Sequence, residues 1–115
     1  MKRGEIRLVD LDPARGAEAN KRRPAVIVSN DGANSTATTL RRGVITVVPI
    51  TSNVERVYPF QVHLRATETG LARDSKAQAE QVRSIAVERI GHRIGALPAP
   101  VMAQVDEALR LHLGL

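Results

Sequence analysis

The sequence predicts a mainly β chain that folds as one small β-barrel domain over residues 1–115, with a single helix at its C-terminus. Three observations lead to this fold class. Short β-branched runs recur along the chain and are separated by turn-forming residues. The connections between these runs lack the helices that a parallel sheet needs. Helical spacing of apolar residues is clear only near the C-terminus, and the length suits one hydrophobic core.

Three strands are expected in the first half of the chain, at residues 5–11, 24–29 and 43–50. The first places Ile6 and Leu8 on one face and ends at Asp12-Pro13. Pro24 suits the first position of the second strand, where no ladder N–H is lost.

Two loops are expected between these three strands. Residues 14–23 (ARGAEANKRR) form a polar loop without periodicity. Residues 30–42 (NDGANSTATTLRR) are the longest turn-rich stretch, and we expect them to form a mobile loop.

The second half is expected to contain one clean strand and two ambiguous segments. Residues 59–66 alternate in polarity, which places Phe60, Val62 and Leu64 inward and Gln61, His63 and Arg65 outward. Residues 76–85 fit either a strand or a short helix, and residues 87–95 can hold a helical turn. The count of strands is therefore four or five.

The C-terminal segment predicts an amphipathic helix over residues 100–113, packed on the sheet. Pro98 and Pro100 precede it and Gly114 stops it. Its apolar stripe comprises Val101, Val105, Ala108, Leu109 and His112. Met102 and Leu113 widen the stripe, and we interpret them as core or dimer contacts.

Charge and aromatic content indicate the kind of partner. The net charge is +5, and 14 of the 17 basic residues are arginine, whose planar fork matches phosphate oxygens. Residues 15–42 alone carry a net +4, which suggests a polyanionic partner; a merely basic surface is the equally weighted alternative from composition. Tyr58 and Phe60 are the only aromatic residues, so no platform for base stacking is expected.

Several functional classes have no sequence support. The chain has no apolar run long enough for a membrane span and no apolar signal segment. It has no cysteine, which suits a reducing cytoplasm, and its three histidines are scattered. Asp10 and Asp12 are a weak metal pair and are more typical of a turn cap. Nucleotide-binding and hydrolase motifs are absent.

Three cations, Lys21, Arg22 and Arg23, stand immediately before Pro24 and a buried strand. A guanidinium held at such a junction can bind a phosphate and stabilise charge that develops on it. We therefore single out Arg23. The alternative is a surface arginine paired with Glu18.

Two further positions can carry chemistry. Thr51, Ser52 and Asn53 follow a buried strand, and their side chains can orient a phosphate or cap a turn. Glu18 lies five residues before Arg23, and its carboxylate can act as a general base or stabilise the loop through a salt bridge.

These motifs together resemble the MazF/PemK toxins of bacterial type II toxin–antitoxin pairs. The matching blocks run in order across residues 3–85: Arg3-Gly4-Glu5-Ile6, Asp10-Leu11-Asp12-Pro13, Gly16-Ala17-Glu18, Arg23-Pro24-Ala25-Val26-Ile27-Val28-Ser29-Asn30, Val48-Pro49-Ile50-Thr51-Ser52, Tyr58-Pro59-Phe60-Gln61-Val62 and Glu80-Gln81-Val82-Arg83-Ser84-Ile85.

The resemblance implies an SH3-like β-barrel that forms a cytoplasmic homodimer, as in the wider MazF/PemK/CcdB group. It implies metal-independent cleavage of single-stranded RNA, without a cofactor, through attack by the 2′-hydroxyl, which leaves a 2′,3′-cyclic phosphate and a 5′-hydroxyl. It also implies a cognate antitoxin, which we expect to be acidic and largely disordered, and contact with operator DNA only through that antitoxin.

By resemblance, the catalytic positions are Arg23, Thr51 and Glu18. The residues expected to bind RNA are Lys21, Arg22, Asn30, Ser52, Asn53 and Arg83. Two departures concern proton transfer and binding: Arg7 replaces a common aromatic residue, and Ala17 stands where a histidine base can occur.

Two other functions remain open at this point. Gyrase-poisoning toxins of the same fold end in a tryptophan-containing tail, whereas this chain ends LHLGL and has no tryptophan. A non-catalytic nucleic-acid-binding module would not need both Arg23 and Thr51.

Overall fold

Strand β3 (Val44–Thr51) is the central strand of the computed structural model, which describes all residues from 1 to 115. Strand β2 (Arg22–Ile27) pairs with one edge of β3. The other edge of β3 pairs first with β6 (Arg83–Ala86) and then, at its last two residues, with β5 (Ser75–Gln78). One strand therefore links both halves of the sheet.

The complete sheet has seven strands in the order β4-β5-β3-β2-β1-β7, with β6 paired to β3 beside this path. The remaining strands are β1 (Glu5–Asp10), β4 (Gln61–Leu64) and β7 (Ile90–Ala96). Every pairing is antiparallel. The predicted class, a mainly β chain with a C-terminal helix, is confirmed.

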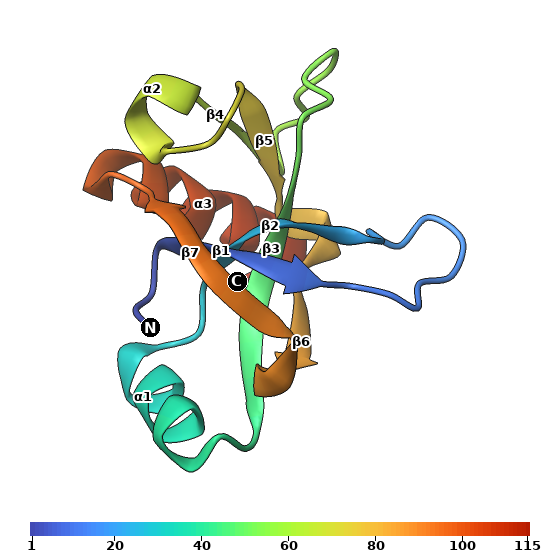
Figure 1. The fold of residues 1–115 in the computed structure, drawn as a ribbon. Helices are drawn as coiled ribbons and strands as arrows, with labels where there is room; N and C mark the ends of the chain where they lie inside the picture. Colours follow the sequence, from blue (N-terminus) through green and yellow to red (C-terminus); the bar gives the residue numbers. More distant parts are fainter.

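Helices cover the two ends of this bent sheet (Figure 1). Helix α3 packs against β4 and lies below it in this view, α2 lies near β4 at the same end, and α1 lies at the opposite end of β3. The helical segments are α1 (Asp31–Leu40), α2 (Ala66–Thr69), α3 (Ala99–Leu113) and the short 3-10 turns η1 (Ala79–Gln81) and η2 (Val87–Arg89). None of these helices combines the length and apolarity required to cross a bilayer.

The hydrophobic core consists of two clusters. One includes Val105 and Ala108 of α3 and the sheet residues beneath them, and the other includes Ala37 of α1. Strand β1 contributes to both clusters, through Ile6 to the first and Val9 to the second. Register shifts between β1 and β7 around Arg7 explain why Val9, rather than Leu8, is the second buried residue of β1.

The expected strands and the C-terminal helix are present, with bounds shifted by one or two residues. The expected count of four or five strands is too low, because the ambiguous segment 76–85 contains β5, η1 and β6. The other ambiguous segment, 87–95, contains η2 and most of β7. Gly114 ends α3 in a left-handed conformation, as predicted.

The expectation of a mobile loop at residues 30–42 is wrong, because most of this segment forms helix α1. The side chain of Asn30 caps α1 by accepting a hydrogen bond from Ala33 N at 2.8 Å. Asn34 is completely buried, and its Nδ2 donates to the carbonyl of Ser29 at 2.8 Å. Polar contacts therefore stabilise a helix that has little apolar surface.

Two predicted placements near strand ends are also corrected. Pro24 is the third residue of β2 rather than the first, since Arg22 and Arg23 already pair with β1. Gln61 is not on the outer face but 8% exposed. Its Nε2 donates to Glu80 Oε2 at 2.6 Å, which supplies the hydrogen bond that a buried amide requires.

Candidate nucleic-acid site

A cleft of about 280 Å³ lies where β2 begins and β3 ends. The segment that leads into β5 forms its third side. The residues that line the cleft are Lys21, Arg22, Arg23, Pro24, Ile50, Thr51, Ser52, Leu71, Ala72, Arg73 and Ser75. Four cations and three hydroxyls therefore surround a small apolar floor, a composition suited to a phosphate.

The register of β2 and β3 brings the two predicted catalytic positions to the same end of the sheet. Ala25 pairs with Pro49 in this antiparallel ladder. Continuing the register by two residues places Arg23 opposite Thr51, and directly opposite side chains share one face of a sheet. The two side chains accordingly line the same cleft.

Arg23 is anchored by hydrogen bonds rather than by an acid. Its Nε donates to the carbonyl oxygen of Asn20 at 2.7 Å, and one terminal nitrogen donates to Asn20 Oδ1 at 3.1 Å. The alternative of a pair with Glu18 is not observed, and no carboxylate lies within 4.0 Å of the guanidinium. Arg23 therefore retains its full charge and further N–H groups for a ligand.

Lys21 connects the loop to β2 in an unusual backbone conformation. Its φ angle is 65°, in the left-handed region that non-glycine residues seldom adopt. The carboxylate of Asp12 accepts a hydrogen bond from Lys21 N at 2.8 Å and closes the base of the loop. Asp10 accepts one from Asp12 N at 3.1 Å, so the interpretation of these acids as turn caps is confirmed.

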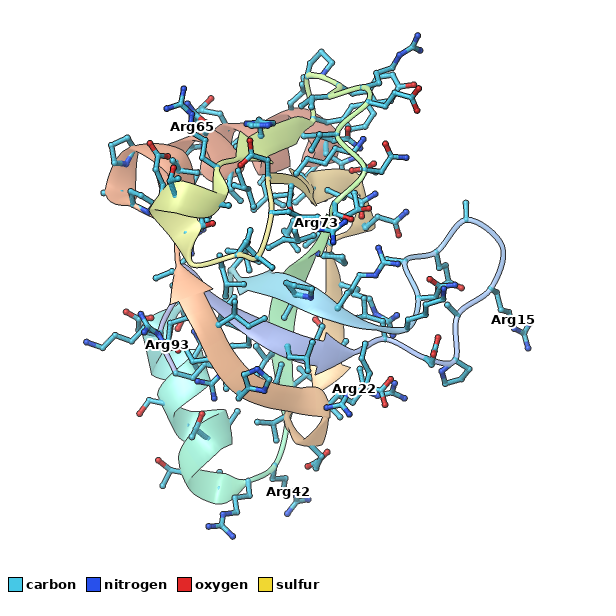
Figure 2. The ribbon with its side chains drawn as sticks, turned by 45° about the horizontal axis from the view of Figure 1, so that its top comes forward. Arg15, Arg22, Arg42, Arg65, Arg73 and Arg93 are labelled. Atoms are coloured by element: carbon cyan, nitrogen blue, oxygen red, sulfur yellow. The ribbon has the colours of Figure 1, made fainter.

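Arg73 is a cleft residue that the sequence did not identify. It lies in the connection between α2 and β5, which no motif marked. Figure 2 shows Arg73 above the sheet and Arg22 on the side of the β1–β2 loop, so the cleft draws cations from separate segments.

Glu18 and Arg83 line a different cleft, together with Glu80 and Gln81. Glu18 Oε1 accepts from the backbone N of Arg15 at 2.8 Å, so this carboxylate stabilises its own loop. Neither Glu18 nor Arg83 is among the residues that surround Arg23. The structure therefore separates the predicted base from the other two catalytic positions.

The side-chain amide of Gln81 attaches the β1–β2 loop to η1. Its Oε1 accepts from Ala19 N at 2.9 Å, and its Nε2 donates to the carbonyl of Ala17 at 2.9 Å. These two bonds hold the loop that separates the two clefts.

Two asparagines predicted to bind RNA have structural partners. Asn30 caps α1 and is not part of the cleft. Asn53 lies in the turn after Thr51, where its N donates to Thr51 Oγ1 at 3.3 Å and its Oδ1 accepts from Glu55 N at 3.2 Å. Asn53 therefore shapes the turn next to the cleft.

The concentrated +4 region of residues 15–42 is divided in the structure. Figure 2 shows Arg15 at the tip of the β1–β2 loop, whereas Arg42 lies beside α1. Arg41 lines a separate hollow with Met1 and Arg7. Only the cations at positions 21–23 reach the cleft, where Arg73 joins them.

Comparison with known proteins identifies the family. The model of the PemK-like, MazF-like toxins of type II toxin–antitoxin systems matches residues 2–113. The chain belongs to this family. It is 69% identical over 115 residues to endoribonuclease MazF9 of Mycobacterium tuberculosis, covering all of this chain and 98% of that protein. It is 34% identical to endoribonuclease EndoA of Bacillus subtilis, covering all of this chain and 96% of that protein.

Solved structures support the same assignment for this MazF-like toxin. The crystal structure of MazF from Deinococcus radiodurans superposes with a TM-score of 0.83 at 28% identity, covering all of this chain and 97% of that one. A MazE–MazF structure from the same organism gives a TM-score of 0.74 at 26% identity, covering 100% and 96%. The prediction of a MazF-type endoribonuclease toxin is thus confirmed at the level of the family.

Proposed function

We propose that this MazF-like toxin cleaves single-stranded RNA by attack of a ribose 2′-hydroxyl on the adjacent phosphate. The products are a 2′,3′-cyclic phosphate and a 5′-hydroxyl. The observation that carries the proposal is the shared cleft of Arg23 and Thr51, in which the guanidinium has no acidic partner.

The chemistry requires stabilisation of a phosphorus centre that gains negative charge. Arg23 faces the cleft on a backbone held by the β1–β2 ladder, so its charge needs little reorganisation during the reaction. The hydroxyl of Thr51 can donate a hydrogen bond to a phosphate oxygen from the opposite strand. Arginine and hydroxyl groups supply this stabilisation themselves, and the proposed mechanism assigns no metal and no cofactor.

The remaining cleft residues hold the substrate. Lys21, Arg22 and Arg73 are exposed cations that would neutralise neighbouring phosphates, and Ser52 offers a further hydroxyl. Arg83 would contact RNA that continues over the β1–β2 loop into the neighbouring cleft.

Glu18 is proposed as the acceptor of the 2′-hydroxyl proton. Among the carboxylates of the β1–β2 loop, Glu18 is the one that lines the neighbouring cleft, and its other oxygen, Oε2, has no hydrogen-bond partner. RNA that crosses this loop would bring the ribose towards Glu18 and the phosphate towards Arg23. A Glu18→Gln variant that cleaves RNA at the normal rate would remove Glu18 from this role.

A homodimer and a cognate antitoxin are the proposed partners. A groove of about 650 Å³ between β4 and α3 includes Leu111, which is 58% exposed, and exposed Leu113 and Leu115 follow it. A second copy would cover this apolar face. The cations of the main cleft suit an acidic antitoxin segment, and a MazE–MazF structure exists for the Deinococcus relative.

The decisive experiment uses purified protein and a long single-stranded RNA in EDTA, with the cleavage ends mapped. We expect cuts at a short sequence motif, with cyclic phosphate and 5′-hydroxyl ends. If the protein binds the RNA but does not cleave it, the result would instead support a non-catalytic binding module. Inhibition of gyrase in place of RNA cleavage would support the other toxin class.

A further inference from the structure

We propose that Tyr58 is a stacking platform for one unpaired nucleobase of the RNA, next to the phosphate held in the cleft. This inference rests on the proposed function, because it extends the same site along the substrate. It also revises the expectation that two aromatic residues are too few for base stacking. The argument depends on how the loop between β3 and β4 is held.

The two aromatic rings of the chain lie together in this loop. Tyr58 and Phe60 stack with their centroids 5.4 Å apart and their planes 4° from parallel. Phe60 is partly buried, whereas Tyr58 is 42% exposed. The pair thus presents a flat aromatic surface to solvent, supported from below by a second ring.

Two cations lie over the Tyr58 ring in cation–π positions. The guanidinium carbon of Arg56 lies 5.6 Å from the Tyr58 centroid, and the ammonium nitrogen of Lys76 lies 5.9 Å from it. Arg56 also donates to the Tyr58 hydroxyl at 3.2 Å. A nucleotide combines a flat base with a phosphate, and it matches an aromatic ring beside the exposed cation Arg56.

The platform is continuous with the cleft. Lys76 is the direct partner of Thr51 across β3 and β5, so one ladder position separates the phosphate site from the cation beside Tyr58. The chain also runs from Ser52, in the cleft, directly into the loop that carries Tyr58.

Buried polar groups fix the loop in this conformation. Lys76 is only 8% exposed, and its Nζ donates to the carbonyl of Arg56 at 2.6 Å. Gln61 is equally buried and makes two hydrogen bonds to Tyr58. Its side-chain Oε1 accepts from the backbone N of Tyr58 at 3.1 Å, and its backbone N donates to the Tyr58 carbonyl at 2.8 Å. Burying an amide and an ammonium is costly. Here both hold an exposed ring in place, which is the preorganisation that a binding surface requires.

An unpaired base suits this surface better than a paired one. Stacking on a single exposed ring needs an open base face, which single-stranded RNA offers and a duplex does not. The Tyr58 hydroxyl is the only polar atom of the two rings, and it already accepts a hydrogen bond from Arg56. The surface would therefore bind bases through their faces rather than read their edges.

The chain permits a direct optical test. Tyr58 is the only tyrosine and there is no tryptophan, so intrinsic fluorescence reports on this ring alone. The probe is an oligoribonucleotide that spans a mapped cut site, with one deoxyribose at the cut to prevent cleavage. We expect binding to quench the Tyr58 emission. Replacing bases one at a time by abasic residues should abolish the quenching at one position near the cut and preserve it elsewhere.

Variants provide the second readout. Tyr58→Leu should raise KM for RNA cleavage about tenfold while leaving kcat largely intact, as expected for loss of one stacked base. Tyr58→Phe should restore most of the affinity. Val57→Ala is the matched control, because Val57 is an equally exposed neighbour in the same loop, and it should change neither quantity.

The outcomes separate this inference from the proposed function. If the wild type cleaves RNA but binding leaves the fluorescence unchanged, or if Tyr58→Leu behaves as Val57→Ala does, the platform is disproved and the nuclease stands. If Tyr58→Leu weakens only the binding of an antitoxin segment, the surface serves a protein partner and the inference is also wrong. If the wild type does not cleave RNA, the proposed function itself fails.

Discussion

Arg23 donates two hydrogen bonds to Asn20, one to its carbonyl oxygen at 2.7 Å and one to its side-chain Oδ1 at 3.1 Å. Both acceptor atoms belong to Asn20 in the β1–β2 loop, so this residue orients the guanidinium. We expect Arg23→Lys to lower kcat for RNA about 100-fold, because the charge remains but the fork is lost. Asn20→Ala removes one anchor and should cost about fivefold. Single-turnover cleavage measures the rates of both variants, and Arg42→Lys, beside α1, is the control.

The hydroxyl of Thr51 is expected to act on the substrate rather than on the fold. Thr51→Val should slow cleavage about tenfold or more, whereas its effect on stability should be small, since Thr51 Oγ1 accepts only a long 3.3 Å bond from Asn53 N. Thr46→Val is the control on the same strand, at the end away from the cleft. Equal cleavage rates for the two variants would exclude a role for the Thr51 hydroxyl.

The 2′-hydroxyl of the substrate is the proposed nucleophile. An RNA with one deoxyribose on the 5′ side of the cut should resist cleavage but bind nearly as tightly, since the phosphate contacts remain. Rate and affinity are measured on the same oligonucleotide. Normal cleavage of this substrate would contradict the mechanism.

Asn30 tests whether a predicted RNA contact is instead a helix cap. Asn30→Ala should lower the free energy of unfolding by about 1 kcal/mol, because Ala33 N loses its acceptor. RNA affinity and kcat should not change, since Asn30 lies outside the cleft. Denaturant unfolding measures the free energy of unfolding, and binding and cleavage assays measure RNA affinity and kcat. A variant of normal stability that binds RNA poorly would restore the original prediction.

Gln81 should control the order of the β1–β2 loop. Gln81→Leu removes both bonds to Ala17 and Ala19 but keeps a side chain of similar size. We expect trypsin to cut at Arg15 up to about thirtyfold faster, because the two bonds together contribute about 2 kcal/mol. Gln104→Leu on α3 is a matched control. Unchanged proteolysis would show that the loop is held by other contacts.

The α3 groove predicts the oligomeric state. We expect the wild-type protein to sediment as a dimer at micromolar concentration and Leu111→Arg to sediment as a monomer, because a charge would be buried in an apolar contact. Leu40→Arg, on an equally exposed residue of α1, should remain dimeric. A wild type that is only monomeric would refute this part of the proposal.

Much of the fold was predictable because β-branched runs mark buried strands. The exception at α1 has a clear physical cause. The sequence DGANSTATTL contains Gly, Ser, Thr and Asn, which favour turns in isolation, and only Asn34 and Ala37 of this helix are buried. Asn34 bonds to Ser29, whose Oγ accepts a hydrogen bond from Thr46 N of β3 at 3.1 Å. This link to the sheet, and not the local sequence pattern, stabilises the helix.

The site was predictable only where its residues adjoin a strand end. Arg23 and Thr51 lie at the ends of β2 and β3, where hydrophobic runs locate them. Arg73 belongs to a connection without a pattern, and its position depends on how β5 folds back onto β3. Glu18 shows the opposite error: closeness in sequence to Arg23 suggested closeness in space, yet the loop places the two in different clefts.

The left-handed backbone of Lys21 also restricts which sequences can reach this cleft. Glycine and asparagine adopt that conformation easily, whereas valine and isoleucine do so only under strain. A substitution at position 21 must therefore satisfy two requirements. The new residue must adopt the left-handed backbone conformation, and it must also supply a suitable charge. A single-nucleotide change from a lysine to an asparagine codon keeps this backbone conformation and removes one cation from the cleft, so the charge of the cleft can change without a cost in backbone strain.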